Sequence, residues 1–218
     1  MFKDRHEAGT QLAGKLSHLA GRNAVILALP RGGVPVGRSL ADILGSELDV
    51  IVTRKLGAPH NAELAIGAVC EDGTRILNTE LIRILRVPQE HIQRTTESEL
   101  EEMRRRLAVY RGGRPAIPLA GRIAVVTDDG VATGFTMLAA LRAVRRQKPA
   151  KLIMAVPVAA PEALQDLREA ADEVVCLHAP PGFAAVGEHY QDFSAPSDEE
   201  VKRQLEERGS TLTPHNPS

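Results

Sequence analysis

The sequence is poor in aromatic side chains and in cysteine. Its 218 residues include no tryptophan, two tyrosines, four phenylalanines and two cysteines. So few rings argue against a stacking platform for single-stranded nucleic acid, and they require a core of Ala, Val, Ile and Leu. Cys70 and Cys176 stand far apart and form no CxxC pair, so we expect neither a disulfide framework nor a zinc site.

The sequence also lacks an excess of charge of either sign and a long apolar run. The formal net charge is -1, so no overall basic field attracts nucleic acid, and we expect no nucleic-acid partner. The first residues, "MFKDRHEAG", lack the apolar centre of a signal peptide, and no apolar stretch is long enough to span a bilayer. We therefore expect no membrane partner and a cytoplasmic protein.

Short apolar runs alternate with helical periodicity along most of the chain. Such runs are typical of buried strands, and they lie at 24–29, 47–56, 121–129, 151–159 and 172–179. Alternating strands and helices imply right-handed crossovers and a parallel sheet with ligands at the carboxyl ends of its strands. We expect an α/β fold, a Rossmann-like parallel β-sheet flanked by helices.

Three further segments have patterns of their own. We predict a loop at 57–67, a hairpin at 65–77 that turns at Glu71–Gly73, and helices at 78–111 with a break at Pro88.

We predict a single domain over 1–218 with additions to one core. The core covers about 22–178, the stretch 78–111 is a helical insertion, and about 179–208 forms a hood and C-terminal segment. A capping signal at Ser197 predicts a helix within that last segment.

The stretch "VVTDDGVATGFTM" carries the clearest chemistry. Asp128 and Asp129 end an apolar strand, and the turn "GVATG" feeds a helix that starts near Phe135. Amides in such a turn gather positive potential that suits a phosphate, and Thr133 and Thr136 can add hydroxyl donors. The lysine of a P-loop and the GxGxxG of a dinucleotide site are both missing. The structural alternative is a strand, turn and helix with capping aspartates, but adjacent acids repel and usually need a cation or hydroxyl donors.

This stretch resembles the phosphoribosyl-pyrophosphate (PRPP) motif of type I phosphoribosyltransferases. The resemblance implies that family's fold with a small hood. By the same resemblance, Asp128 and Asp129 would bind the ribose 2′- and 3′-hydroxyls. The 5′-phosphate would be held by the loop residues Gly130, Val131, Ala132, Thr133, Gly134 and Thr136.

Two other segments are similar to loops of the same family. Arg31-Gly32-Gly33, in "LPRGG", is similar to the family's pyrophosphate loop, which often contains a non-proline cis peptide; alone, it is equally consistent with a turn. Arg54 and Lys55 match the position of the flexible loop that closes over the substrate, although a basic residue at a strand end can simply be solvated. The resemblance implies that Arg31, Lys55, Asp128 and Asp129 are catalytic and that Gly32, Gly33 and Arg54 also bind PRPP.

The segment "PPGFAAVGEHYQDF" loosely resembles the hood over the base in purine-salvage members. Phe183, Val186 and Tyr190 would then line an acceptor pocket; the alternative is a small satellite core. One position departs from the family pattern. Hypoxanthine–guanine enzymes carry an aspartate where this sequence has Ala132, which leaves the group that transfers a proton unassigned.

The resemblance implies transfer of the 5-phosphoribosyl group of PRPP to a nitrogenous base or similar acceptor, with release of pyrophosphate. Mg²⁺ would be bound mainly through PRPP, with no protein metal ligand. The expected partners are PRPP, a small-molecule acceptor and a second copy in a homodimer. Two alternatives stay open: a PRPP- or nucleotide-binding regulator without turnover, and a hydrolase or phosphorylase that acts on ribose phosphates.

Overall fold

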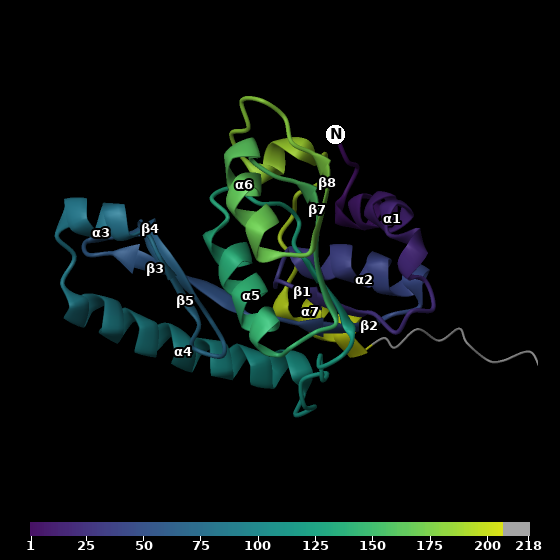
Figure 1. Cartoon of the computed structure of the whole chain (residues 1–218), viewed down its shortest axis with the longest axis horizontal. Helices are drawn as coiled ribbons and strands as arrows, with labels where there is room; N and C mark the ends of the chain where they lie inside the picture. Colours follow the sequence, from purple (N-terminus) through teal and green to yellow (C-terminus); the bar gives the residue numbers. More distant parts are fainter. Residues whose placement is uncertain (207–218) are drawn as a thin grey trace, which may run out of the picture.

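A five-stranded parallel sheet forms the centre of the protein (Figure 1), as seen in a computed structural model that describes residues 1–206. Its strands, in spatial order, are β2 (Glu47–Val50), β1 (Val25–Ala28), β6 (Ile123–Thr127), β7 (Lys151–Val158) and β8 (Glu173–His178). Residues 207 and 208 of the predicted C-terminal segment lie outside the described residues.

Helices cover both faces of this sheet. Ile26, Val125 and Ile153 pack in one core cluster with α1 (Arg5–Lys15) and α2 (Gly33–Leu44). Their strand neighbours pack in another with α5 (Phe135–Arg146) and α6 (Pro161–Ala170). Because both faces of the central strands β1, β6 and β7 are buried, these three strands read as nearly continuous apolar runs. The predicted α/β fold class is confirmed.

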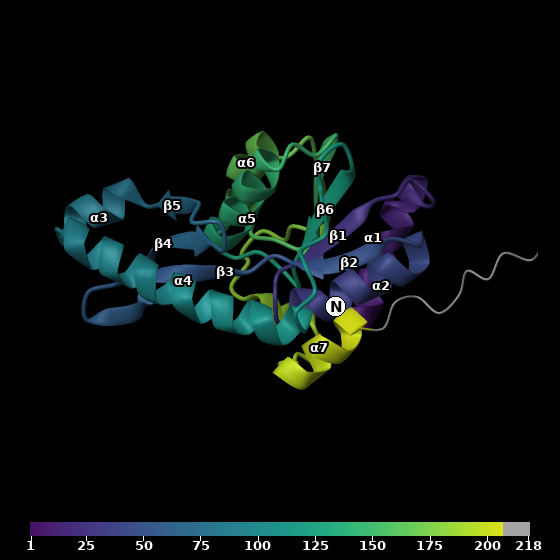
Figure 2. The same ribbon diagram turned by 90° about the horizontal axis from the view of Figure 1, so that it is seen from below.

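A second unit projects from this core, and we call it the arm (residues 53–111). It contains the antiparallel sheet β3 (Thr53–Ala58), β4 (Asn61–Cys70) and β5 (Arg75–Leu77), followed by the helices α3 (Thr79–Leu85) and α4 (Gln89–Arg111). Figures 1 and 2 show the arm extending to one side of the parallel sheet, with the long helix α4 beneath its strands. The helices within 78–111 and the break near Pro88 agree with the sequence prediction.

The prediction for the strands at the base of the arm was wrong. The run 47–56 is not one strand. Its first four residues form β2 of the parallel sheet, and the chain then leaves that sheet and begins β3 at Thr53. The stretch 57–67 is a hairpin rather than a loop. It turns at His60, whose φ is +65°. A Cβ on Gly57 would lie 2.8 Å from Ala62 Cα, so the small residues that suggested a loop instead let two strands approach closely.

Short elements complete the fold. They are the 3₁₀ turns η1 (Ser17–Leu19) and η2 (Val186–His189) and the last helix, α7 (Asp198–Glu206). The predicted cap is present, because the amide of Glu200 donates to Ser197 Oγ at 3.1 Å. Within residues 1–206, no helix has both the length and the apolar character needed to cross a membrane.

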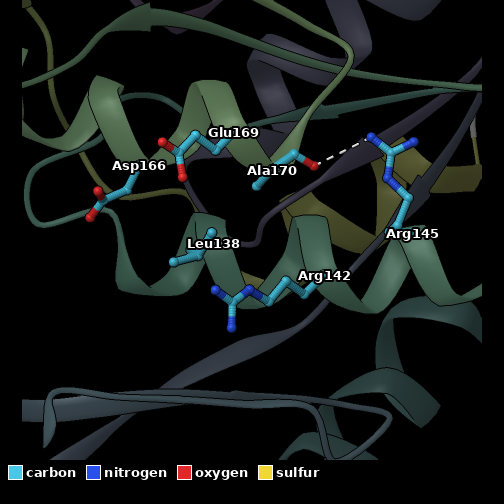
Figure 3. Close-up of a pocket in the computed structure, with 6 residues that line it drawn as sticks. All are labelled: Leu138, Arg142, Arg145, Asp166, Glu169 and Ala170. Carbon is cyan, nitrogen blue, oxygen red and sulfur yellow. Dashed lines mark hydrogen bonds between the residues drawn. The ribbon is translucent and has the colours of Figure 1, made fainter.

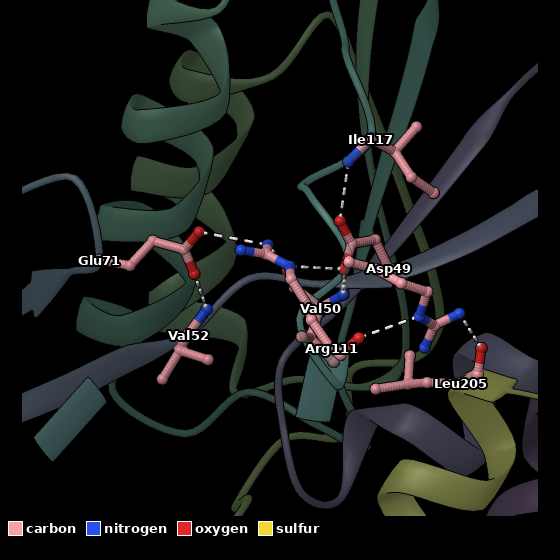
Figure 4. A network of polar contacts seen from close by, with 8 residues as sticks. Asp49, Val50, Val52, Glu71, Arg111, Ile117 and Leu205 are labelled. Atoms are coloured by element: carbon pink, nitrogen blue, oxygen red, sulfur yellow. Dashed lines mark hydrogen bonds and ion pairs between the residues drawn. The ribbon is translucent and has the colours of Figure 1, made fainter. Parts of the chain in front are cut away.

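A polar network joins the arm to the parallel sheet (Figure 4). Arg111, the last residue of α4, donates to Asp49 Oδ1 at 3.0 Å, to the Val50 carbonyl at 2.9 Å and to Glu71 Oε1 at 3.3 Å. The amide of Val52 donates to the other oxygen of Glu71 at 2.9 Å. Burial raises the pKa of Glu71, and the nearby Arg111 opposes that effect. A single guanidinium therefore satisfies two carboxylates where the arm begins.

Replacing Arg111 by methionine should destabilise the protein by about 2 kcal/mol, because Asp49 and Glu71 would lose the cation that they share. Urea unfolding followed by circular dichroism measures the change. Arg145→Met is the matched control, since it breaks a more exposed arginine–aspartate pair with Asp172 that is worth less than about 1 kcal/mol. Equal losses from the two variants would contradict a special role for this network.

Candidate functional site

The loops predicted to bind PRPP meet at one point of the parallel sheet. β1 pairs with β2 on one side and with β6 on the other. The connection after β1 therefore runs to one edge of the sheet, whereas the strands from β6 onward are added towards the opposite edge, which makes the gap between β1 and β6 a topological switch point. Ligands of open α/β sheets bind at such a switch point, outside the carboxyl ends of the strands. Residues 30–33, which we call the Arg-Gly-Gly loop, follow β1, and the acid pair Asp128–Asp129 follows β6.

The Arg-Gly-Gly loop lies directly against the acid pair. Its Pro30–Arg31 peptide bond is cis. A Cβ on Gly32 would lie 2.0 Å from Asp129 Oδ2, and one on Gly33 would lie 2.9 Å from Asp128 Cα. Glycine is therefore required at both positions by the closeness of the two loops.

Residues 130–136, the Thr-Gly loop, connect the acid pair to α5. The amide of Val131 donates to the Val158 carbonyl at 2.9 Å, which anchors the loop to the end of β7. Gly134 has a φ of +80° and precedes the first residue of α5. Within residues 1–206, the amides of 132–134 make no hydrogen bond. Together with the first amides of α5, they are available to an anion.

The two acids have different surroundings. Asp128 Oδ1 accepts a hydrogen bond from the amide of Asp129 at 2.8 Å. Burial, followed by the negative charge of Asp129, raises the pKa of Asp128 well above its ordinary value. Asp129 instead has a cation within hydrogen-bond distance.

That cation is Arg5, the first residue of α1, and sequence reasoning missed it. Its Nε and Nη2 atoms each lie 2.8 Å from Asp129 Oδ2, and its Nη1 donates to the Ser194 carbonyl at 2.8 Å. The guanidinium carbon lies 4.0 Å from the centre of the Phe193 ring. Only 7% of Arg5 is exposed. No spacing in the sequence links residue 5 to the acid pair, so no sequence signal could have identified it.

The guanidinium of Arg31 is half-exposed and lies beside the C-terminal helix. Its Nη1 is 4.0 Å from Asp198 Oδ1, in the first turn of α7. The Tyr110 hydroxyl donates to the same oxygen at 2.7 Å. Burial, reinforced by the hydrogen bond to Asp198, raises the pKa of Tyr110 to about 12, so this hydroxyl stays protonated near neutral pH.

The basic residues Arg54 and Lys55 belong to the arm. Both lie on β3, where Lys55 is exposed and pairs in register with Ala68. Arg54 Nε donates to Glu99 Oε2 at 2.7 Å. The segment that contains them, Thr53–Ala58, is a strand and not the loop that the resemblance implied. Their role in binding pyrophosphate stays a prediction.

The three residues predicted to line an acceptor pocket occupy different environments. Tyr190 is 5% exposed, and its hydroxyl donates to the Asp129 carbonyl at 2.6 Å, so it supports the acid pair. A Cβ on Gly130 would lie 2.5 Å from Val186 Cγ1, so Val186 packs closely against the start of the Thr-Gly loop. The partly exposed Phe183 stacks on His189 with ring centres 5.5 Å apart. Val186 and Phe183 are therefore the two that remain available to a ligand.

A groove lies between α5 and α6, the two helices that cover one face of the parallel sheet (Figure 3). Its volume is about 580 Å³, and it is lined by Leu138, Arg142, Arg145, Asp166, Glu169 and Ala170. None of the predicted site residues lines it. Acids and bases face each other across it, so it presents no field of a single sign.

Comparison with known proteins identifies the family. A family model described as "Phosphoribosyl transferase domain" matches residues 3–192, a range that includes both loops, the acid pair and Arg5. The chain belongs to this family. The predicted resemblance is thus confirmed, and the chain carries a phosphoribosyl transferase domain.

Relatives within the family are similar over nearly the whole chain. Proteins of two Mycobacterium tuberculosis strains, named "Putative phosphoribosyl transferase" MT0597 and Rv0571c, are each 45% identical over 201 residues, or 92% of this chain. The chain spans about 45% of the length of those relatives. The crystal structure of TT1426 from Thermus thermophilus is 44% identical with a TM-score of 0.79, and the match covers 94% of this chain and 97% of that one.

The raised pKa of Asp128 predicts a change of stability with pH. A group whose pKa is raised by folding favours the folded state most at low pH, and this contribution is lost as the pH rises through the folded pKa. Asp128→Asn removes the charge and should stabilise the phosphoribosyl transferase domain, on the order of 1 kcal/mol near pH 8. The gain should shrink towards pH 4, close to the ordinary pKa of 3.8.

Thermal unfolding at pH 4, 6 and 8 measures this gain, and Asp172→Asn is the control of opposite sign. The hydrogen bond from Arg145 lowers the pKa of Asp172, so its replacement should destabilise the protein more at pH 8 than at pH 4. An Asp128→Asn variant that is less stable than the wild type at pH 8 would contradict the assigned cost of this charge.

Proposed function

We propose that this phosphoribosyl transferase domain transfers the 5-phosphoribosyl group of PRPP to a nitrogen of a small acceptor and releases pyrophosphate. One observation carries the proposal: at the β1–β6 switch point, the Arg-Gly-Gly loop lies against the acid pair, with Gly32 in contact with the Asp129 carboxylate. A site for the sugar hydroxyls therefore adjoins a site for pyrophosphate. The amides of the Thr-Gly loop provide a third site, for the 5′-phosphate.

The chain's own residues suit the charges of this reaction. The bond between the anomeric carbon and pyrophosphate breaks with its electron pair on pyrophosphate, while the acceptor nitrogen forms a new bond to that carbon and then loses its proton. The guanidinium of Arg31 and the amides of Arg31 and Gly32 would stabilise the negative charge on pyrophosphate; the amide of Gly33 already donates to the Leu29 carbonyl at 2.9 Å. Asp128 and Asp129 would hold the ribose through its 2′- and 3′-hydroxyls, which fixes the anomeric carbon between leaving group and acceptor.

The residues present fit a magnesium ion that is bound mainly through the substrate. Within residues 1–206, no group of three or more His, Cys, Asp or Glu side chains could hold a metal by itself. Carboxylate oxygens at the diol site are hard donors, and Mg²⁺ usually keeps several waters. When bound to PRPP, the ion would neutralise part of the charge of pyrophosphate.

Phe183 and Val186 would face the acceptor in this proposal, and Tyr190 would act through Asp129. A homodimer and a cytoplasmic location remain predictions.

The decisive experiment mixes the protein with PRPP, Mg²⁺ and a panel of nucleobases and follows pyrophosphate. Release that depends on one base supports the proposed transfer and identifies the acceptor. Release without any base favours a hydrolase, and binding of PRPP without release, measured by calorimetry, favours a regulator. A protein that neither binds nor turns over PRPP would overturn the proposal.

A further inference from the structure

The geometry points to Arg5 as a positioning residue of the ribose site: it holds one oxygen of the Asp129 carboxylate and leaves the other free for a hydroxyl of the sugar. This inference rests on the proposed function, because it names how that site is kept in a binding conformation. Arg5 itself touches no part of the substrate in this proposal.

The two oxygens of the Asp129 carboxylate have different surroundings. Both guanidinium contacts, from Nε and Nη2 of Arg5, are made to Oδ2. Oδ2 is also the atom that a Cβ on Gly32 would meet at 2.0 Å. Neither guanidinium contact involves Oδ1, so Arg5 leaves the capacity of that oxygen to accept a hydrogen bond unused.

The Arg5 side chain has little freedom to move. The Ser194 carbonyl accepts from its Nη1, and its planar group lies 4.0 Å from the Phe193 ring centre. A buried guanidinium with three kinds of partner is fixed in both position and orientation. The carboxylate that it binds is fixed with it, and the Tyr190 hydroxyl holds the Asp129 carbonyl from a different direction.

Hydrogen bonds at the start of the chain hold α1 at the site. The amide of Phe2 donates to the His189 carbonyl at 2.8 Å, and the amide of Gln191 donates to the Phe2 carbonyl at 2.8 Å. Asp4 caps α1 by accepting from the amide of Glu7 at 2.8 Å. These bonds place the first helical residue, Arg5, between the acid pair and the segment after η2. The start of the chain and the hood segment thus assemble around one carboxylate.

The positive charge also makes the acid pair possible. Two adjacent carboxylates disfavour each other's charged form, and an opposite charge within a few ångströms offsets that effect. Arg5 supplies this charge, with its Nη2 2.8 Å from Asp129 Oδ2.

A double-mutant cycle tests the role of Arg5, with affinities for Mg²⁺–PRPP and for Mg²⁺–pyrophosphate measured by calorimetry. Arg5→Gln should weaken PRPP binding by on the order of tenfold and leave pyrophosphate binding unchanged, because Asp129 is assigned to the sugar hydroxyls and the pyrophosphate to Arg31 and its loop. In the Asp129→Asn background, Arg5→Gln should cause no further loss. Arg5→Lys should recover part of the affinity, since lysine restores the positive charge but not the planar set of donors of the guanidinium.

Two controls separate positioning from folding. Arg145→Gln, which breaks a surface pair with Asp172, should bind both ligands as the wild type does. Circular dichroism checks that each variant is folded. If Arg5→Gln fails to fold, Arg5→Lys decides the question, with a several-fold loss for PRPP and none for pyrophosphate.

Three results would overturn the inference: wild-type affinity for PRPP in Arg5→Gln (in Arg5→Lys, if Arg5→Gln does not fold), equal losses for PRPP and pyrophosphate, or additive effects of Arg5→Gln and Asp129→Asn. A wild-type protein that binds neither ligand would overturn the proposed function as well. That failure is recognisable because it needs no variant.

Discussion

Replacing Asp128 and Asp129 together by asparagine should weaken binding of PRPP by about a thousandfold. A hydrogen bond to a charged group contributes roughly 1.5–3 kcal/mol, and in the double variant two such acceptors lose their charge. Asp128→Asn by itself is expected to stabilise the domain, whereas Asp129→Asn breaks the buried pair with Arg5 and costs stability. Circular dichroism therefore checks that the double variant is folded. Calorimetric titration with Mg²⁺–PRPP gives the affinity.

The matched control for the double variant is Asp166→Asn with Glu169→Gln. It changes the net charge by the same amount, in the α5–α6 groove instead of at the β1–β6 edge. It should bind PRPP with wild-type affinity. Comparable losses in the two double variants would mean that overall charge, and not a ribose site, governs binding.

Gly32→Ala should weaken PRPP binding by roughly ten- to hundredfold while leaving most of the fold intact. The new methyl group would lie 2.0 Å from Asp129 Oδ2, so the carboxylate must turn away and break its pair with Arg5. Overpacking of this kind costs about 1–3 kcal/mol. The backbone itself is not strained by alanine, because the φ of Gly32 is -61°. Affinity and thermal unfolding are measured on the same preparation.

Gly14→Ala is the control for this substitution. Gly14 lies in α1, and a Cβ there would meet nothing within 4 Å. Alanine in a helix interior is more favourable than glycine by up to about 1 kcal/mol, so this variant should be slightly more stable and should bind PRPP normally. A Gly32→Ala variant that also binds normally would contradict the close contact between the two loops.

Most of the parallel sheet could be predicted from the sequence because its signals are local. Apart from Lys151, the runs at 24–29 and 151–159 are continuous and apolar, and helical periodicity separates the strands, which is what burial on two faces requires. The first hairpin of the arm could not be predicted in the same way. Gly57, Pro59 and Asn61 are residues typical of loops, and only the pairing of β3 with β4 makes Gly57 and Asn61 part of a sheet.

The sequence by itself determined the local chemistry: two acids at a strand end, a glycine- and threonine-containing turn before a helix, and a basic loop after another strand. Only the tertiary structure decided that these parts meet at one switch point and that Arg5, 124 positions from Asp129, binds one of the acids. The physical reason is that strand, turn and cap preferences depend on neighbouring residues. An ion pair between distant residues depends on how the whole chain packs.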